Sequence, residues 1–287
     1  MYARPMLSPK TAVGEMSLRA LISDPRNALL AFDFDGVLSP IVDDPEQAQP
    51  LPDIFGAIAD LSLRVGAVAI ITGRPVSFVI SRNGFHVLES VSGLTIYGHY
   101  GLERWDAISR TISSQPAIGD IAAVRAELEQ LLRQAHIPAG VWLEDKGSAV
   151  AVHTRRTADP DAALAVVSQP VQEVASRHQL RVEPGKMVLE IRPAGISKGD
   201  VLREIVSEHR FTSVLYAGDD LGDLSAFMAV DALRSTGVAG VKVCSASAEA
   251  PEVAEAADLV VDGPVGIVDL LAYIRREVES AAEAAGR

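Results

Sequence analysis

The sequence predicts an α/β fold in which a parallel sheet with crossover helices is interrupted by a small inserted α+β domain. Short apolar runs alternate with helical patterns early in the 287-residue chain and again late in it, and the middle follows another pattern. Such alternation is typical of parallel strands joined by crossover helices. With 48% hydrophobic and 22% charged residues, the composition fits a globular protein and excludes disordered, collagenous and coiled-coil chains.

The first stretch of alternation begins near Asn27. The expected elements are a strand at 29–34, a helix at 52–64, a strand at 67–71 and a helix at 75–82. Proline suits the first turn of a helix, where its missing N–H needs no partner, so Pro52 indicates a helix start. Residues 1–24 precede this pattern and are expected to form a flexible N-terminal extension.

The same alternation returns late in the chain. The expected helices lie at 201–209, 224–233 and 267–278, and the expected strands at 213–217, 240–243 and 258–261. We expect both stretches, residues 25–106 and 194–287, to form one core. In the middle, two helical patterns at 118–135 and 162–178 are each followed by two short strands, and the second strand pair flanks the hairpin signal Pro184-Gly185-Lys186. This order predicts an inserted cap domain at 107–193.

Charge and composition exclude several classes of function. Acidic residues outnumber basic ones by 38 to 26, and the net charge of -12 disfavours nucleic acid and anionic membranes, which both select a basic surface. The longest apolar run, 65–71, is far shorter than the roughly 18 residues that cross a bilayer. No secretory signal is visible in the first twenty residues, and the single Cys244 suits a reducing compartment. We expect a cytoplasmic enzyme with neither nucleic acid nor membrane as a partner.

Two carboxylates lie at the end of the first predicted strand, directly after its apolar residues 29–32. Asp33 and Asp35 are separated by Phe34, and Gly36 allows the chain to turn away. The carboxyl ends of parallel strands form the ligand crevice of such sheets. Two neighbouring carboxylates either bind a cation or raise the pKa of one of them, and both outcomes suit phosphoryl transfer, which needs a nucleophile and a proton carrier. The alternative is an Asp-Gly turn in which the carboxylates only cap backbone donors.

A second acidic group follows the strand expected at 213–217. Asp219, Asp220 and Asp223 are three carboxylates within five positions, a pattern that suggests oxygen ligation of a hard cation such as Mg²⁺. Helix N-capping by Asp220 or Asp223 is the alternative for one of them. Capping does not explain all three.

Two further motifs lie where helices begin. Thr72-Gly73-Arg74-Pro75 offers a hydroxyl and backbone N–H groups at a helix start, which is an anion site. Lys198 also begins a helix, where its charge opposes the helix dipole, so a phosphate or a carboxylate is expected nearby. Simple helix capping and a solvated surface lysine are the alternatives. The coincidence of all four motifs predicts one crevice, and phosphate-loop and dinucleotide-binding fingerprints are absent from the sequence.

These motifs resemble a known family. DFDGVLSP, ITGRP, SKG and GDDLGD, in this order, are similar to the four signatures of haloacid dehalogenase-like phosphatases, which use an aspartyl-phosphate and Mg²⁺. AFDFDGVLSPIVDDP, YGHYGLER, EDKGSAVAVHTR, GKMVLEIRP and GDDLGDLSAF resemble motifs of trehalose-6-phosphate phosphatases, from about residue 31 to the C-terminus. The resemblance implies a Rossmann-like core, a cap for sugar recognition, and Mg²⁺-dependent hydrolysis of trehalose 6-phosphate in trehalose biosynthesis. It also implies a trehalose-phosphate synthase as a functional partner.

The resemblance assigns roles to individual residues. Asp33 resembles the nucleophile, and Asp35 the acid/base whose main-chain carbonyl also reaches Mg²⁺. Thr72 and Lys198 match the phosphate-binding pair. The implied metal ligands are Asp33, Asp35, Asp219 and Asp220, with Asp223 as an alternate ligand. The implied substrate contacts are Gly73, Arg74, Glu144, Lys146, Lys186 and Glu190, with His153 and Arg155 as further candidates.

Departures and alternatives remain open. Val37, Gly222 and the pair Leu224-Ser225 depart from the family pattern, which puts the tuning around the metal in question. For Glu144 and Lys146, a cross-turn ion pair is the alternative to sugar binding. A phosphatase for another sugar phosphate, such as sucrose phosphate or a glycosylglycerate phosphate, is a second functional hypothesis. An inactive regulatory partner of a trehalose-phosphate synthase is a third, and the retained catalytic aspartates argue against it.

Overall fold

The computed structural model describes residues 8–89, 91, 93–114, 121–146, 149–193, 197–246 and 251–285. The chain forms two compact units, the core (Met1–Ser113 with Ser197–Arg287) and the insertion (Ser114–Ile196). The insertion starts later than the predicted residue 107 because the core sheet continues into strand β5 (Ile112–Ser114). Within the described residues, no helix combines the length and the apolar character needed to cross a membrane.

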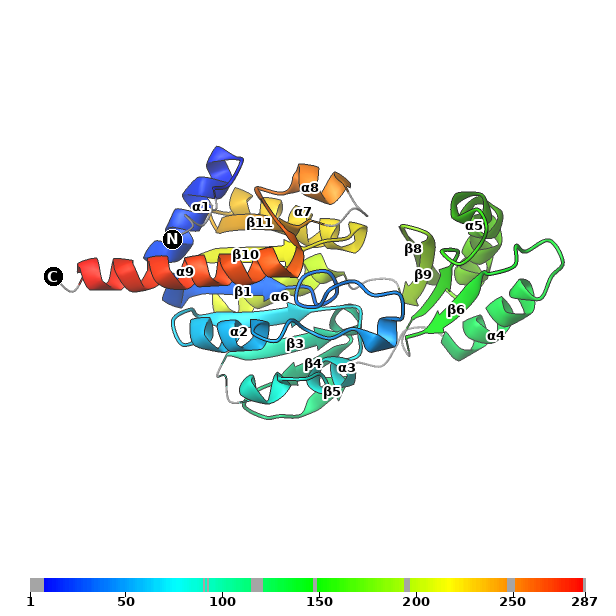
Figure 1. Cartoon of the computed structure of the whole chain (residues 1–287), viewed down its shortest axis with the longest axis horizontal. Coiled ribbons are helices and arrows are strands. Elements are labelled where there is room, and N and C mark those ends of the chain that lie inside the picture. Colours follow the sequence, from blue (N-terminus) through cyan, green and yellow to red (C-terminus); the bar gives the residue numbers. More distant parts are fainter. Residues whose placement is uncertain are drawn as a thin grey trace. The chain divides into compact units, whose positions relative to one another are not determined.

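The core contains an eight-stranded sheet in the order β12-β11-β10-β1-β2-β3-β4-β5 (Figure 1). Besides β5, its strands are β1 (Ala28–Phe32), β2 (Ala67–Ile71), β3 (Leu94–Gly98), β4 (Glu103–Asp106), β10 (Ser213–Gly218), β11 (Ala239–Ser245) and β12 (Leu259–Val261). β1 is parallel to both β2 and β10. The chain adds strands outward on both sides of this centre, so the strand order reverses between β1 and β10, where ligands of such sheets bind.

The predicted parallel sheet is confirmed for β12, β11, β10, β1 and β2. β3, which is parallel to β2, was not among the expected strands, and neither was the edge. β4 runs antiparallel to β3. β4 has the sequence Glu-Arg-Trp-Asp, so it lacks the continuous apolar run that identifies a fully buried strand.

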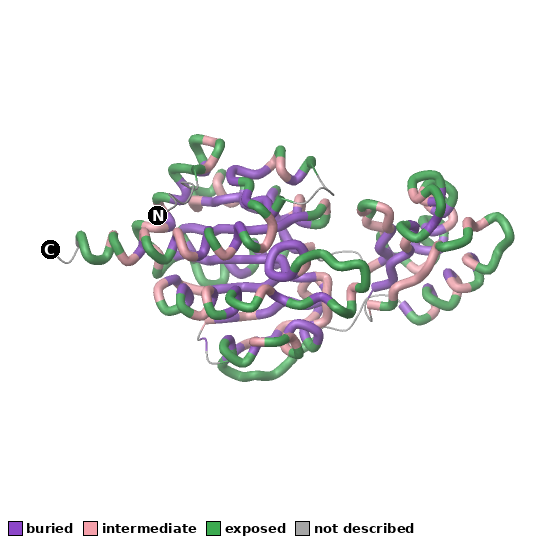
Figure 2. The backbone as a smooth tube through the Cα atoms, in the orientation of Figure 1, coloured by how far each residue is buried: buried purple, intermediate pink, exposed green. Residues whose placement is uncertain are grey.

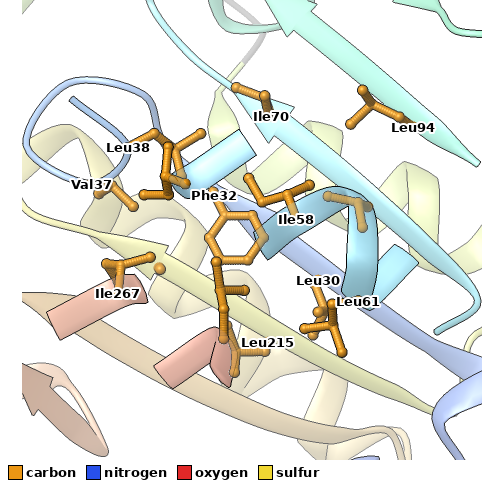
Figure 3. Packing of buried hydrophobic residues seen from close by; sticks show 14 of the residues in the cluster. Leu30, Phe32, Val37, Leu38, Ile58, Leu61, Ile70, Leu94, Leu215 and Ile267 are labelled. Carbon is orange, nitrogen blue, oxygen red and sulfur yellow. The ribbon is translucent and has the colours of Figure 1, made fainter. Parts of the chain in front are cut away.

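Helices cover both faces of the core sheet. They are α1 (Ala12–Ser23), α2 (Ile54–Ser62), α3 (Val76–Ile80), α6 (Lys198–His209), α7 (Leu224–Ser235), α8 (Pro251–Ala256) and α9 (Gly263–Ala285). On one face, Phe32 lies among Ile58 of α2, Ile267 of α9 and Leu215 of β10 (Figure 3). On the other, the ring of Tyr216 meets that of Phe227 in α7 edge to face. The central strands are therefore buried on both sides, as their apolar sequences require (Figure 2).

The N-terminal segment corrects one prediction. Residues 12–23, expected to belong to a flexible extension, form α1. Leu18 and Leu21, three positions apart on one helix face, are 3% and 0% exposed. Each such burial contributes about 1.5–3 kcal/mol. Thr11 caps the helix by accepting from the Gly14 N–H and donates to Asp258, so this segment is anchored to the core.

The insertion is the predicted α+β unit. Its antiparallel sheet has the order β6-β7-β9-β8. The elements are α4 (Ile121–Leu132), β6 (Trp142–Asp145), β7 (Val150–His153), α5 (Pro160–Arg177), β8 (Leu180–Gly185) and β9 (Val188–Pro193). One sheet face packs on the apolar sides of α4 and α5, and its buried side chains include Val150, Val152, Leu189 and Ile191. The opposite face carries polar side chains, as alternation along a strand dictates.

Candidate active site

Three charged side chains from distant parts of the chain meet at the strand ends of the core. Lys198 Nζ donates to Asp33 Oδ2 at 2.7 Å and to Asp223 Oδ1 at 2.7 Å. The side chains of Lys198, Asp33 and Asp223 are 3%, 7% and 0% exposed. Ser197 and Asp200 form a capping box that begins α6 at Lys198. The sequence predicted a carboxylate or a phosphate near this lysine, and the structure provides two carboxylates.

The surroundings raise the pKa of Lys198 and of Asp33 and lower that of Asp223. Burial would lower the pKa of Lys198, but Asp223 and Asp33 outweigh it and raise that pKa well above the usual value. Burial would raise the pKa of Asp223, but Lys198 and the hydrogen bond from Tyr216 lower it. Burial raises the pKa of Asp33 well above the usual range, and Asp223 and Asp220 add to this rise while Lys198 opposes it. Asp33 is therefore the carboxylate that needs additional positive charge to stay ionised.

Asp223 organises the loop after β10. Its Oδ1 also accepts from Tyr216 Oη at 2.6 Å, and its Oδ2 accepts from the backbone N–H groups of Asp219 and Asp220 at 2.9 and 3.2 Å. Asp220 is the N-cap of the short 3-10 helix Leu221–Asp223 and forms a capping box with Asp223, whereas Asp223 makes no side-chain cap at the start of α7. Tyr216 was missed by the sequence analysis because it reads as one more buried strand residue.

Three of the acidic residues form a group that could hold a metal ion. Asp33, Asp220 and Asp223 each offer one carboxylate oxygen, and these oxygens lie within 4.8 Å of one another. The carboxylate of Asp219 lies against Gly36, whose φ of +68° favours glycine and where a Cβ would clash with it. Burial, with the charges of Asp220, Asp223 and Asp33, raises the pKa of Asp219 well above the usual range. Crowded oxygen donors of this kind, buried at Asp33, Asp219 and Asp223 and exposed at Asp220, favour a hard cation.

The four predicted metal ligands are placed differently. Asp33 and Asp220 belong to the group of converging side-chain oxygens, and Asp219 lies beside it against the loop after Asp33. The side chain of Asp35 is outside the group, which is compatible with the expected role of its main-chain carbonyl. Asp223 also belongs to this group, but its described hydrogen bonds come from Lys198, Tyr216 and the backbone N–H groups that follow β10.

Arg74 binds Asp35 through a two-point ion pair. Arg74 Nε donates to Asp35 Oδ2 at 2.7 Å, and Nη2 donates to Oδ1 at 3.0 Å. The Asp35 side chain is 37% exposed and that of Arg74 is 11% exposed. The residue expected to contact substrate therefore contacts the acid/base candidate.

The loop after β2 is held by the segment 98–101. Thr72 is 1% exposed, and its hydroxyl oxygen accepts from the Arg74 N–H at 3.1 Å. The Tyr100 N–H donates to the Thr72 carbonyl at 2.9 Å, and a Cβ on Gly73 would come within 2.7 Å of Tyr100 Oη. His99 and Tyr100 have φ angles of 48° and 59°, a left-handed conformation that is costly for residues with side chains and persists where the surrounding structure enforces it. Sequence reasoning missed Tyr100, although it lies in the quoted motif YGHYGLER.

The polar face of the insertion gathers three of its four predicted sugar contacts. Glu144 is opposite Ala151, and Ala151 is opposite Glu190, so both glutamates lie on one face of the sheet. Lys146 forms an ion pair with Glu190, and Glu144 Oε2 lies 2.9 Å from His153 Nε2.

Two other predicted cap positions lie elsewhere, and one aromatic residue was missed. Lys186 lies in the turn between β8 and β9 and is exposed, and Arg155 is exposed beyond β7. Trp142 stacks on His153 with ring centroids 4.3 Å apart. Its place on the same face, two residues before Glu144, follows from strand alternation.

The fold is that of the haloacid dehalogenase-like hydrolases, one of which, from Bacteroides thetaiotaomicron, matches with a TM-score of 0.58 and 16% identity over 86% of this chain and 99% of that one. The core and the insertion together resemble the C-terminal domain of trehalose-6-phosphate phosphatase from C. albicans, with a TM-score of 0.74, 20% identity and coverage of 95% of this chain and 99% of that one. At this identity the likeness concerns the fold.

Sequence similarity narrows the class to one family. The family Trehalose-phosphatase matches residues 31–262. A trehalose-phosphate phosphatase of Mycobacterium leprae is 32% identical over 263 residues, which are 88% of this chain and 58% of that protein. A probable trehalose-phosphate phosphatase of Sinorhizobium fredii is 31% identical over 227 residues, 78% of this chain and 82% of that protein. The chain belongs to the trehalose-phosphatase family, and it spans little more than half the length of the M. leprae relative.

Proposed function

We propose that this chain hydrolyses trehalose 6-phosphate to trehalose and phosphate, with Mg²⁺ and through an aspartyl-phosphate on Asp33. Membership of the trehalose-phosphatase family supports the substrate. The observation that carries the chemistry is the buried contact of Lys198 with Asp33 beside an acidic group that fits a cation. This arrangement pairs a nucleophile with positive charge, the main requirement of phosphoryl transfer.

The acidic residues would hold the metal ion. Asp33, Asp219 and Asp220 would bind Mg²⁺ through their side chains and Asp35 through its main-chain carbonyl, and the bound ion would neutralise charge on the phosphoryl oxygens. Lys198 and Thr72 add a cation and a hydroxyl for the same phosphoryl group. Both carboxylate oxygens of Asp33 are oriented, one by Lys198 and the other by the Phe34 N–H at 2.7 Å.

The reaction has two steps with balanced proton transfer. In the first, an oxygen of Asp33 forms a bond to phosphorus while the bond between phosphorus and the sugar oxygen breaks, and protonated Asp35 gives its proton to that oxygen. In the second, ionised Asp35 takes a proton from a water molecule that attacks phosphorus, which releases phosphate and restores both aspartates.

We propose that the polar face of the insertion recognises the sugar. Trehalose offers many hydroxyls and no charge, and carboxylates and ammonium groups form strong charge-assisted hydrogen bonds with hydroxyls. Glu144, Lys146 and Glu190 provide such groups on one sheet face. The buried thiol of Cys244 suits the proposed cytoplasmic location, where a trehalose-phosphate synthase would supply the substrate.

A substrate panel tests the proposal. Phosphate release is measured from trehalose 6-phosphate, sucrose 6-phosphate, glucose 6-phosphate and a glycosylglycerate phosphate, with Mg²⁺ and with EDTA. We expect the highest kcat/KM for trehalose 6-phosphate and loss of turnover with EDTA. If another sugar phosphate gives the higher kcat/KM, that compound is the substrate in place of trehalose 6-phosphate. If none of the compounds is hydrolysed, the result favours an inactive regulatory partner of a trehalose-phosphate synthase.

A further inference from the structure

The two candidate catalytic aspartates are held by different cations. Lys198 contacts Asp33, whereas both oxygens of Asp35 accept hydrogen bonds from the guanidinium of Arg74. A two-point bond of this kind fixes the plane of a carboxylate as well as its position, which an ammonium group does not do. A protonated carboxyl keeps one strong acceptor oxygen, so one of the two bonds remains when Asp35 carries the proton, and that bond still restricts the direction in which the hydroxyl points.

Arg74 is itself held on several sides. Its guanidinium carbon lies 4.4 Å from the centre of the Phe78 ring, and that ring meets the ring of Phe34 edge to face at 6.0 Å. Phe34 is the residue between the two aspartates. The backbone of Arg74 is fixed too, because its N–H donates to the Thr72 hydroxyl and its carbonyl accepts from the His99 N–H at 3.0 Å.

We propose that Arg74 is a positioning residue that orients the Asp35 carboxylate toward the oxygen of the leaving sugar. This inference rests on the proposed function and replaces the expected role of Arg74 as a direct substrate contact. In the first step, the bond from phosphorus to the sugar oxygen breaks as the proton of Asp35 moves to that oxygen. Arg74 acts on this step through Asp35 and forms no bond with the reacting atoms.

Two substrates with different leaving groups distinguish a positioning role of Arg74 from a role in phosphate binding. A sugar alkoxide needs the proton from Asp35 as it leaves, whereas p-nitrophenolate leaves without one. kcat/KM includes steps only up to the first irreversible one, here the transfer of the phosphoryl group to Asp33, so the later use of Asp35 as a base does not enter it. Loss of Arg74 should therefore reduce kcat/KM for the sugar phosphate and largely spare the aryl phosphate.

The test compares the wild type with Arg74→Gln, Arg74→Lys, Asp35→Asn and Arg74→Gln/Asp35→Asn, on trehalose 6-phosphate and p-nitrophenyl phosphate. General acid catalysis contributes about 10²–10⁴-fold, so we expect Asp35→Asn to lose about that much on the sugar phosphate. Arg74→Gln should lose about ten- to a hundredfold on the sugar phosphate, a part of the same contribution, and less than about threefold on the aryl phosphate. Arg74→Lys keeps the charge without the two-point geometry and should lose almost as much. In the Asp35→Asn background, Arg74→Gln should have no further effect.

Two results would overturn the inference. Equal losses on both substrates, or an unchanged effect of Arg74→Gln when Asp35 is already Asn, would show that Arg74 binds the phosphoryl group directly. If wild-type protein fails to hydrolyse trehalose 6-phosphate, the proposed substrate is wrong, and the comparison is then made with any alkyl phosphate that it does hydrolyse. Thermal unfolding of every variant identifies losses caused by misfolding, and Arg74→Lys keeps the test open if Arg74→Gln does not fold.

Discussion

Asp33→Asn and Asp223→Asn should change stability by very different amounts, although both remove one buried carboxylate. Asp223 accepts hydrogen bonds from Lys198, Tyr216 and two backbone N–H groups, and its pKa is lowered once Lys198 and Tyr216 outweigh burial. Burial raises the pKa of Asp33 well above the usual range, so the folded protein favours its neutral form. Asparagine imitates that neutral form.

The magnitudes follow from these surroundings. Removing one partner of a buried ion pair costs about 3–5 kcal/mol, so Asp223→Asn should lower the unfolding free energy of the core by about that amount. At about 2–4 °C per kcal/mol for a domain of 150–250 residues, its Tm falls by about 6–20 °C. For Asp33→Asn, the relief of a buried, repelled charge offsets the lost bond to Lys198, and the change stays within about 1 kcal/mol.

The assay uses the two tryptophans of the chain, one in each unit. Trp105 is 4% exposed in the core, and Trp142 belongs to the insertion. In a Trp142→Phe background, fluorescence in a urea titration at pH 7 with EDTA reports the core alone. Equal destabilisation by Asp33→Asn and Asp223→Asn, or a larger loss for Asp33→Asn, would refute this account of the buried charges.

Three further predictions test other parts of the molecule. Mg²⁺ at about 100 times its Kd should raise the unfolding free energy of the wild type by about 2.7 kcal/mol in the same titration. Asp220→Asn should reduce this gain. A gain of the same size in Asp220→Asn, at the same Mg²⁺ concentration, would exclude Asp220 as a ligand. Glu190→Gln should lower kcat/KM for trehalose 6-phosphate by about 10–100-fold, the value of a charge-assisted hydrogen bond, and should leave kcat/KM for p-nitrophenyl phosphate largely unchanged. The control is Glu183→Gln, at the position opposite Glu190 on the neighbouring strand β8. Equal losses on both substrates would contradict a role of Glu190 in sugar binding. Burial raises the pKa of Cys244 to about 11, so iodoacetamide at pH 8 should modify this thiol only in denaturant. Because the thiol ionises at a lower pH in the unfolded chain than in the folded one, the unfolding free energy of the wild type should fall between about pH 9 and about pH 11. The fall should be smaller in Cys244→Ala.

Much of the core was predictable because its central strands are buried on both faces and therefore appear in the sequence as continuous apolar runs. The antiparallel edge lacked this signal, since β4 consists mostly of charged residues. α1 was missed because its apolar stripe is short, with Leu18 and Leu21 as its buried leucines.

The site was predictable in its residue types and less so in its pairings. The positions of Asp33 and Asp219 follow from the rule that ligands bind at the carboxyl ends of parallel strands, and a counter-charge beside Lys198 follows from its place at a helix start. The partner of Arg74 and the bond from Tyr216 to Asp223 depend on side chains that only tertiary packing brings together. Such contacts leave no periodic pattern in a single sequence.

The most direct test of the central claim is a search for the phosphoryl group on Asp33 in the Asp35→Asn variant. This variant should accept the phosphoryl group from p-nitrophenyl phosphate, whose leaving group needs no proton, and should then release it slowly because no base activates water. We expect a burst of p-nitrophenol equal to the enzyme concentration and a phosphorylated peptide containing Asp33 by mass spectrometry after rapid quenching. Steady release of p-nitrophenol without a burst, with the phosphoryl group on another residue or on none, would contradict it.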